Sequence, residues 1–295
     1  MGNNSFFEKF NLGVSIPKWM DANTQYLTIS GSYSYGTNMD LSDVDVAGFC
    51  IPPKELIFPH IGGLIDGFDD IQRFEEWQQH HVEYKDRNYD FKVFSIVKIF
   101  KLMMDGNPNT IEVLFCDRDC VLHSTSIAEM VRKNRSLFLS KNIVPRFRGY
   151  AYAELKNVHN QKTGQRRELV EKFGFDVKNA GHVVRLLLEA EQILTTGDLN
   201  LRRDKELIKH IREGNWPLIK IQQFFDEKEP HLLKLEQESE LPNKPDKVKI
   251  KQLLIDCLEH HYGSLEKVIE RRGKSDEVLR QISELIDNNR YCFQN

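Results

Sequence analysis

The pattern of hydrophobic and polar positions is mixed in the first 120 residues, with strand-like, helical and irregular stretches. Tyr89, Phe91 and Val93 are separated by single polar residues, a period of two that is typical of a strand with one buried face. Residues 54–87 are rich in Gly, Asp and His and show no clear period, so we expect irregular structure there. The expected elements are strands over Tyr26–Ser30, Val44–Cys50 and Asn88–Phe94, and helices over Ser95–Asp105 and Thr110–Phe115.

After residue 120 the hydrophobic period is helical almost throughout, and Gly197, Gly214 and Gly273 punctuate it. We therefore predict an α+β chain with a mixed strand-and-helix lobe over residues 1–120 and an α-helical lobe over residues 121–295. The expected helices are Val144–Asn157, Asp176–Thr196, Arg203–Arg212, Pro217–Phe225, Pro245–His261 and Ser275–Asn289.

Composition adds few constraints. The 295 residues are 40% hydrophobic and 29% charged, which is ordinary for a globular protein, and neither a signal peptide nor a membrane span is evident. Five cysteines, an odd number, favour reduced thiols and a cytoplasmic location, or the host cytoplasm if the chain is phage-encoded. Cys116, Cys120 and His123 lack an evident fourth zinc ligand, so we expect buried thiols.

Charge is distributed unevenly. Residues 1–120 contain 18 acidic and 10 basic residues, whereas residues 121–295 contain 26 acidic and 31 basic residues. An acidic N-terminal part and a mildly basic C-terminal part of the chain suit a metal site that faces a phosphate-rich ligand. The total charge of −3 does not by itself demand a nucleic-acid partner.

Asp43 and Asp45 stand one residue apart in a strand-like run. They project from one face, about 7 Å apart, while Val44 and Val46 project from the other face into a core. Two carboxylates this close repel each other, and a divalent cation such as Mg²⁺ removes the conflict. The alternative is a solvated strand face.

Gly31 and Ser32 give these aspartates a context. They follow the first expected strand, and glycine lets the backbone approach a phosphate closely while the exposed amides and the Ser32 hydroxyl hold phosphate oxygens. The order of strand, Gly-Ser, about ten residues and Asp-Val-Asp-Val is much more specific than any of its parts.

This combination resembles the signature of the DNA polymerase beta-type nucleotidyltransferases. The stretch GSYSYGTNMDLSDVDVAGFCIPP is similar to a narrower bacterial and phage group, the RNA-repair-pathway polymerase beta family, as are DFKVFSIVKIFKLM, GNPNTIEVLF and KNAGHVVRLL further on. The resemblance covers most of residues 25–215, with Ser30 as a minor departure. It implies a mixed-sheet catalytic domain over residues 1–120 and an α-helical domain over residues 121–295 that completes the nucleotide and acceptor site.

The resemblance also implies a third carboxylate on a neighbouring strand. Asp90 is the candidate, and Asp86 is its competitor. Asp43, Asp45 and Asp90 would then be both catalytic residues and ligands of two Mg²⁺ or Mn²⁺ ions, with the third acid helping to activate the attacking hydroxyl.

Lys178, His182 and Arg185 share one face of the predicted helix Asp176–Thr196. Three potentially cationic groups in a row are costly without an anion, which a triphosphate would supply; a solvated helix face is the alternative. Lys156, one turn after Tyr152, is a similar candidate for nucleotide binding, alongside Gly31 and Ser32.

Two further stretches have less decisive chemistry. Residues 141–178 hold nine Lys or Arg against four acids and, with Phe147, Tyr150 and Tyr152, suit either an RNA end or an ordinary helix surface. We expect a structural role near the site for Asn107, Pro108, Asn109 and Glu112, and we expect QQHHVEYKDR to be a mobile loop that covers the active site.

The predicted function is a Mg²⁺-dependent transfer of a nucleoside monophosphate from ATP or another nucleoside triphosphate (NTP) to an acceptor hydroxyl. The family resemblance favours an RNA 3′ end, such as that of tRNA, as the acceptor, in RNA repair or modification, with no membrane partner. A protein or small-molecule acceptor is a second hypothesis, and a non-catalytic nucleotide- or RNA-binding module of the same fold is a third. The sequence leaves the NTP preference, the use of a template and the oligomeric state open.

Overall fold

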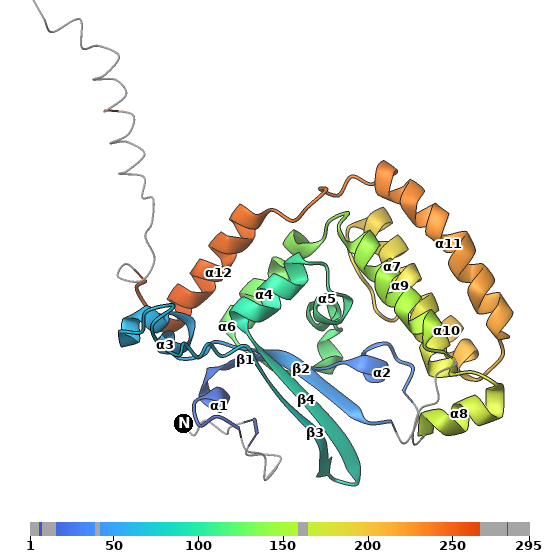
Figure 1. Cartoon of the computed structure of the whole chain (residues 1–295), viewed down its shortest axis with the longest axis horizontal. Coiled ribbons are helices and arrows are strands. Elements are labelled where there is room, and N and C mark those ends of the chain that lie inside the picture. The colour runs from blue at the N-terminus through green and yellow to red at the C-terminus, as the bar shows by residue number, and fades with distance from the viewer. Residues whose placement is uncertain (1–5, 8–15, 39–41, 159–164, 266–281, 283–295) are drawn as a thin grey trace, which may run out of the picture.

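Five strands of the described residues form one mixed sheet. The computed structural model describes residues 6–7, 16–38, 42–158, 165–265 and 282 (Figure 1). The strand order is β3-β4-β2-β1-β5, with β2 and β4 parallel and the other neighbours antiparallel. The strands are β1 Thr24–Ile29, β2 Val44–Cys50, β3 Glu76–Tyr84, β4 Arg87–Ser95 and β5 Val121–Ser124.

Helices cover one face of this sheet and continue beside it as a helical layer in which α7, α10 and α11 pack on α9 (Figure 1). Two short helices, α1 Met20–Asn23 and α2 Gly31–Ser34, flank β1, and α12 packs on α4 and α6. The remaining helices are α3 Lys54–Ile57, α4 Ile96–Met104, α5 Pro108–Phe115, α6 Ser126–Lys133, α7 Ile143–Lys156, α8 Gln165–Phe173, α9 Val177–Thr196, α10 Lys205–Arg212, α11 Leu218–Glu238 and α12 Lys247–Tyr262, and the 3-10 turns are η2 Pro59–Gly62, η3 Arg118–Cys120 and η4 Arg135–Phe138.

Local capping signals determine where several helices begin. Asn107 caps α5 by accepting a hydrogen bond from the Thr110 N–H at 3.3 Å, and Pro108 occupies the first turn, where its missing N–H costs nothing. Asp176 caps α9 by accepting from the N–H groups of Lys178 and Asn179. The predicted structural role of the Asn-Pro turn is thereby confirmed.

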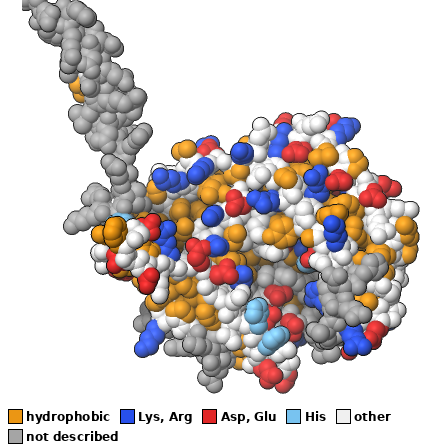
Figure 2. Space-filling view, in the orientation of Figure 1, with side chains coloured by type: hydrophobic (Ala, Val, Ile, Leu, Met, Phe, Trp, Pro, Cys, Tyr) orange, Lys and Arg blue, Asp and Glu red, His pale blue; other side chains and the backbone are white. Residues whose placement is uncertain are grey.

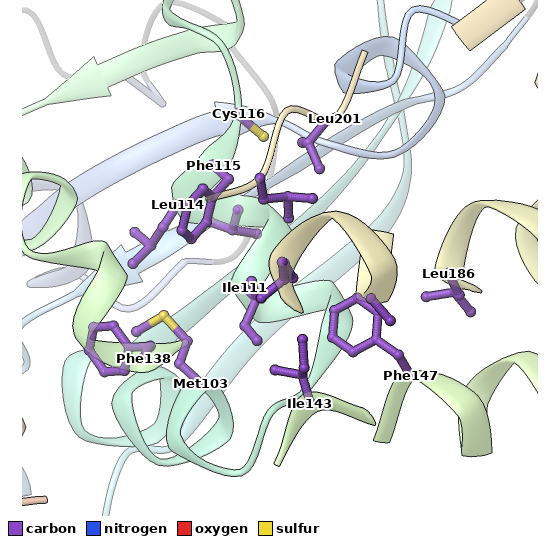
Figure 3. Close-up of a cluster of buried hydrophobic side chains, with 14 of the residues drawn as sticks. Met103, Ile111, Leu114, Phe115, Cys116, Phe138, Ile143, Phe147, Leu186 and Leu201 are labelled. Carbon is purple, nitrogen blue, oxygen red and sulfur yellow. The ribbon is translucent and has the colours of Figure 1, made fainter. Parts of the chain in front are cut away.

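The main hydrophobic core lies between the sheet and the helices (Figure 3). Ile111 and Leu114 of α5 lie among Met103 of α4, Phe147 of α7 and other buried side chains, so residues from both halves of the chain share this core. A smaller core covers the other face of the sheet and contains Leu27, Val44, Val46, Phe91 and Val93. The sheet therefore lies between two buried hydrophobic layers.

The predicted α+β class is confirmed, and most predicted elements are found within one or two residues. The boundary expected at residue 120 stays a prediction; β5 lies just beyond it and pairs with β1. The predicted helix Ser275–Asn289 lies outside the described residues, apart from position 282. In the part of the chain that the structure describes, no helix is long and apolar enough to cross a membrane.

Several expectations about individual segments were wrong or incomplete. Residues 76–84 are not irregular, and QQHHVEYKDR is not a mobile loop: it forms most of edge strand β3 and its turn into β4. Its side chains are largely exposed, so the strand lacks the apolar alternation that identifies strands. Strand β5 was not predicted because it has only four residues. Helix α11 continues past the predicted end at Phe225 because Leu232 extends the buried face of the helix.

Candidate active site

The turn after β1 is built around Gly31, which begins α2. Its φ of +61° lies in the left-handed region, and a Cβ atom at this position would be 2.2 Å from Asp45 Oδ2. The Ser30 N–H donates to the Asp45 backbone oxygen at 2.8 Å. Because only glycine has no side chain to collide with Asp45, the Gly-Ser turn and the first acidic strand lie in direct contact.

Asp45 and Asp90 stand opposite each other on the adjacent parallel strands β2 and β4. Burial, opposed by Lys178, raises the pKa of Asp45 to about 6, and the carboxylates of Asp90 and Asp43 add to this effect. Asp43 is exposed and lies just before β2 begins. The three predicted carboxylates are thus brought to one end of the β2–β4 pair, where they repel one another.

This donor set suits a hard divalent cation, because carboxylates are the ligands that Mg²⁺ and Mn²⁺ prefer and because added positive charge would relieve the repulsion. Among the described residues, no three side chains of His, Cys, Asp or Glu form a ready-made ligand cluster. Asp90 also has contacts within the protein: its Oδ1 accepts from the His81 N–H at 2.8 Å, and its Oδ2 lies 3.4 Å from His80 Nδ1.

A pocket with a basic lining adjoins the acidic strand ends. The charges of Asp45 and Asp43 and those of Arg166 and Arg212 all act on Lys178, with opposite effects on its pKa. Although Lys178 is partly exposed, the surrounding protein and the two arginines lower its pKa. The pocket is lined by Ser32, Tyr35, Thr37, Lys178, Gly181, His182, Arg185, Ile208 and Arg212.

His182 and Arg185 differ in what they offer a ligand. Burial and neighbouring cations lower the pKa of His182 well below its ordinary value, so its imidazole is neutral. Arg185 is buried and already paired: its Nη1 donates to Glu112 Oε1 at 2.5 Å and to Glu189 Oε1 at 2.8 Å. Lys178 is therefore the member of this predicted face whose charge is available, since no ion-pair partner for it is found among the described residues.

The Arg185 network links three helices at the wall of the pocket. Tyr35, at the end of α2, donates to Glu112 of α5, and its ring lies 3.9 Å from the Arg185 guanidinium of α9. Burial raises the pKa of Glu189 well above its usual range, and the neighbouring Arg185 opposes this shift. The network therefore ties the Gly-Ser turn to the helical half.

Other candidates lie away from the pocket. Lys156 is exposed at the end of α7, with Nζ 4.4 Å from the Tyr152 ring centre, and it is absent from the pocket lining. Phe147 is fully buried in the core, so of its two expected roles the structure supports packing in the core and excludes stacking on RNA. Asp86 lies in the two-residue turn between β3 and β4, four residues along the chain from Asp90.

Sequence reasoning missed Arg212 and Thr37. The Arg212 Nη1 donates to the Thr37 backbone oxygen at 2.6 Å and to Thr37 Oγ1 at 3.0 Å, which joins α10 to the segment after α2. These residues are 175 positions apart, and no local pattern connects them. Only the packing of α10 on α9 brings Arg212 to the pocket.

Comparison with known protein families identifies the family of this chain. The model of the RNA repair pathway DNA polymerase beta family (RlaP) matches residues 14–229. The chain therefore belongs to this family, and the family indicates a polymerase beta-type nucleotidyltransferase.

The chain is also similar to a solved structure, a nucleotidyltransferase-like protein from Exiguobacterium sibiricum 255-15. The two are 11% identical, with a TM-score of 0.27, and the match covers 90% of this chain and 85% of the other. No curated protein is similar enough to count as a match.

Proposed function

We propose that the protein is a Mg²⁺- or Mn²⁺-dependent nucleotidyltransferase that transfers a nucleoside monophosphate from an NTP to the 3′ hydroxyl of an RNA. The observation that carries this proposal is the register of Asp45 with Asp90 beside Gly31, with a basic pocket on the adjoining side. Negative ligands for metal and positive ligands for phosphate are thus adjacent, as phosphoryl transfer requires.

The substrate contacts follow from this placement. Lys178 and Arg212 would bind triphosphate oxygens, and the α2 amides with the Ser32 hydroxyl would hold the phosphates next to Asp45. The neutral His182 would serve as a hydrogen-bonding group, and Arg185 would hold Tyr35 and Glu112 in place. Asp86, in the hairpin turn, is the less favourable third carboxylate because Asp90 faces Asp45 directly.

In the reaction, the acceptor oxygen attacks the α-phosphorus, the bond to the bridging oxygen of the β-phosphate breaks, and pyrophosphate leaves. Asp90 would accept the hydroxyl proton, while Asp43, Asp45 and Asp90 would hold the divalent ions. Those ions, when bound, supply positive charge for the phosphate oxygens. General-base help of this kind contributes about 10²–10⁴-fold.

An RNA acceptor is supported by the family to which the chain belongs. The proposal is tested by incubating the protein with each α-labelled NTP, Mg²⁺ and either total cellular RNA or total protein. We expect label in RNA, and none with Asp43→Ala. Label in protein would favour the alternative acceptor, whereas no label with any NTP, together with NTP binding unaffected by Asp43→Ala, would refute the catalytic assignment.

A further inference from the structure

A bulge interrupts the pairing of edge strand β3 with β4 at the point where β4 carries Asp90. Gln79 pairs with Phe91 and Val82 pairs with Tyr89, so His80 and His81 together oppose Asp90 alone. His81 has a φ of +56°, a left-handed conformation that costs a non-glycine residue about 1–2 kcal/mol. Bulges of this kind redirect side chains and interrupt regular pairing.

Both bulge residues contact Asp90, and they do so through different groups. The backbone N–H of His81 donates to Asp90 Oδ1 at 2.8 Å, in place of a ladder bond to the neighbouring strand. The His80 ring nitrogen Nδ1 lies 3.4 Å from Asp90 Oδ2. In the space-filling view, pale-blue histidine side chains lie beside red acidic ones over the β3–β4 hairpin (Figure 2).

These contacts restrict the orientation of a side chain that is otherwise free to turn. The terminal torsion of an aspartate is broad, so a carboxylate without contacts samples many orientations. Two contacts, one to each oxygen, restrict that rotation, and a carboxylate has about four acceptor positions, so others remain for a cation or a hydroxyl. Metal and catalytic ligands need their geometry held within about 0.5 Å.

We propose that the His80–His81 bulge positions Asp90, the third carboxylate of the proposed transferase. The inference rests on the proposed function for the role of Asp90. His81 acts through its backbone N–H and His80 through its imidazole. The alternative is that the bulge only protects the edge strand from pairing with other chains, in which case neither contact would matter to the site.

The test compares five variants of the full chain. Deletion of His81 removes the bulge, and His80→Ala removes only the imidazole contact. His80→Asn is the conservative rescue because its side-chain amide can donate to Oδ2, and His81→Gly retains the N–H and suits the left-handed backbone. Gln78→Ala is the matched control, since Gln78 is exposed on the same strand and pairs with Lys92 instead of Asp90.

Two readouts are needed, so that failure of the proposed function can be distinguished from failure of the inference about the bulge. The first is Mn²⁺ affinity, measured by electron paramagnetic resonance titration of the protein with the metal alone. The second is the pair of constants kcat and KM for NTP, each measured in the labelling assay. We expect His80→Ala and the deletion to weaken Mn²⁺ binding by at least about fivefold and to lower kcat by at least about tenfold, at nearly constant KM.

The control should match the wild type, and His80→Asn should recover most of the Mn²⁺ affinity that His80→Ala loses. Unchanged Mn²⁺ affinity in His80→Ala and in any folded deletion variant would overturn the inference, as would a loss that His80→Asn does not recover. If the wild type transfers no nucleotide, the proposed function fails, while the Mn²⁺ titrations still decide whether the bulge positions Asp90.

Discussion

Gly31 and Asp45 lie in contact: the carboxylate oxygen Oδ2 of Asp45 occupies the space next to the Gly31 α-carbon, 2.2 Å from where a Cβ atom would be. The glycine that begins α2 and the aspartate that would bind metal are thus parts of one arrangement. A change at either residue should therefore alter the other.

Gly31→Ala should abolish Mg²⁺-dependent nucleotide transfer. The new methyl group would displace the Asp45 carboxylate, and the left-handed φ would cost about 1–2 kcal/mol of stability. Gly36→Ala is the matched control, because its φ is also positive but its Cβ would be 3.6 Å from the nearest atom, in the flexible Lys205 side chain. Both variants should lower the Tm, and only Gly31→Ala should lose transfer; equal activities would contradict the contact.

Asp45→Asn should stabilise the metal-free protein at alkaline pH. The folded-state pKa of Asp45 is raised from 3.8 to about 6, mainly by burial, so its stabilising contribution is complete below about pH 4 and is lost as the pH rises through 6. In EDTA at pH 8 the variant should be about 1–3 kcal/mol more stable than the wild type, and the difference should vanish near pH 4. Denaturant unfolding measures this difference.

The same pair of proteins tests for the cation. Adding Mg²⁺ at pH 8 should raise the free energy of unfolding of the wild type more than that of Asp45→Asn, because the variant has lost a charged ligand. An equal gain in both proteins would argue that Mg²⁺ binds elsewhere.

Lys178→Ala and Arg212→Ala should each weaken NTP binding by about tenfold, which corresponds to about 1.4 kcal/mol. Lys178 has an available charge and Arg212 lines the same pocket, whereas Lys156 is exposed outside the pocket lining. Lys156→Ala should therefore bind NTP like the wild type. Calorimetric titration with a non-hydrolysable NTP checks the three variants, and a larger loss in Lys156→Ala would place the phosphate site on α7.

Arg185→Met should mainly lower the stability of the folded protein. It leaves Glu112 buried without its partner, a change that typically costs about 3–5 kcal/mol. The double variant Arg185→Met/Glu112→Met removes both charges and should recover much of that loss. Chemical denaturation of the single and double variants measures the coupling; additive losses would show that the two residues do not act as a pair.

Much of the fold could be predicted because its signals are local. The strand period predicts β2 and β4, and Asp176 marks the start of α9. Edge strand β3 could not be predicted in the same way. Its side chains are largely exposed, and its pairing depends on β4 and on a turn in which Lys85 and Asp86 both have positive φ.

By itself, the sequence determined which residue types stand near one another along the chain: Gly31 with Ser32, Asp43 with Asp45, and Lys178 with His182 and Arg185. Only the tertiary structure decided which of them meet. The parallel pairing of β2 with β4 placed Asp90 opposite Asp45, and helix packing brought Arg212 to Thr37. The tertiary structure also buried Arg185 between Glu112 and Glu189. The physical reason is that capping and periodicity act over a few residues, whereas strand register and charge pairing depend on contacts between distant segments.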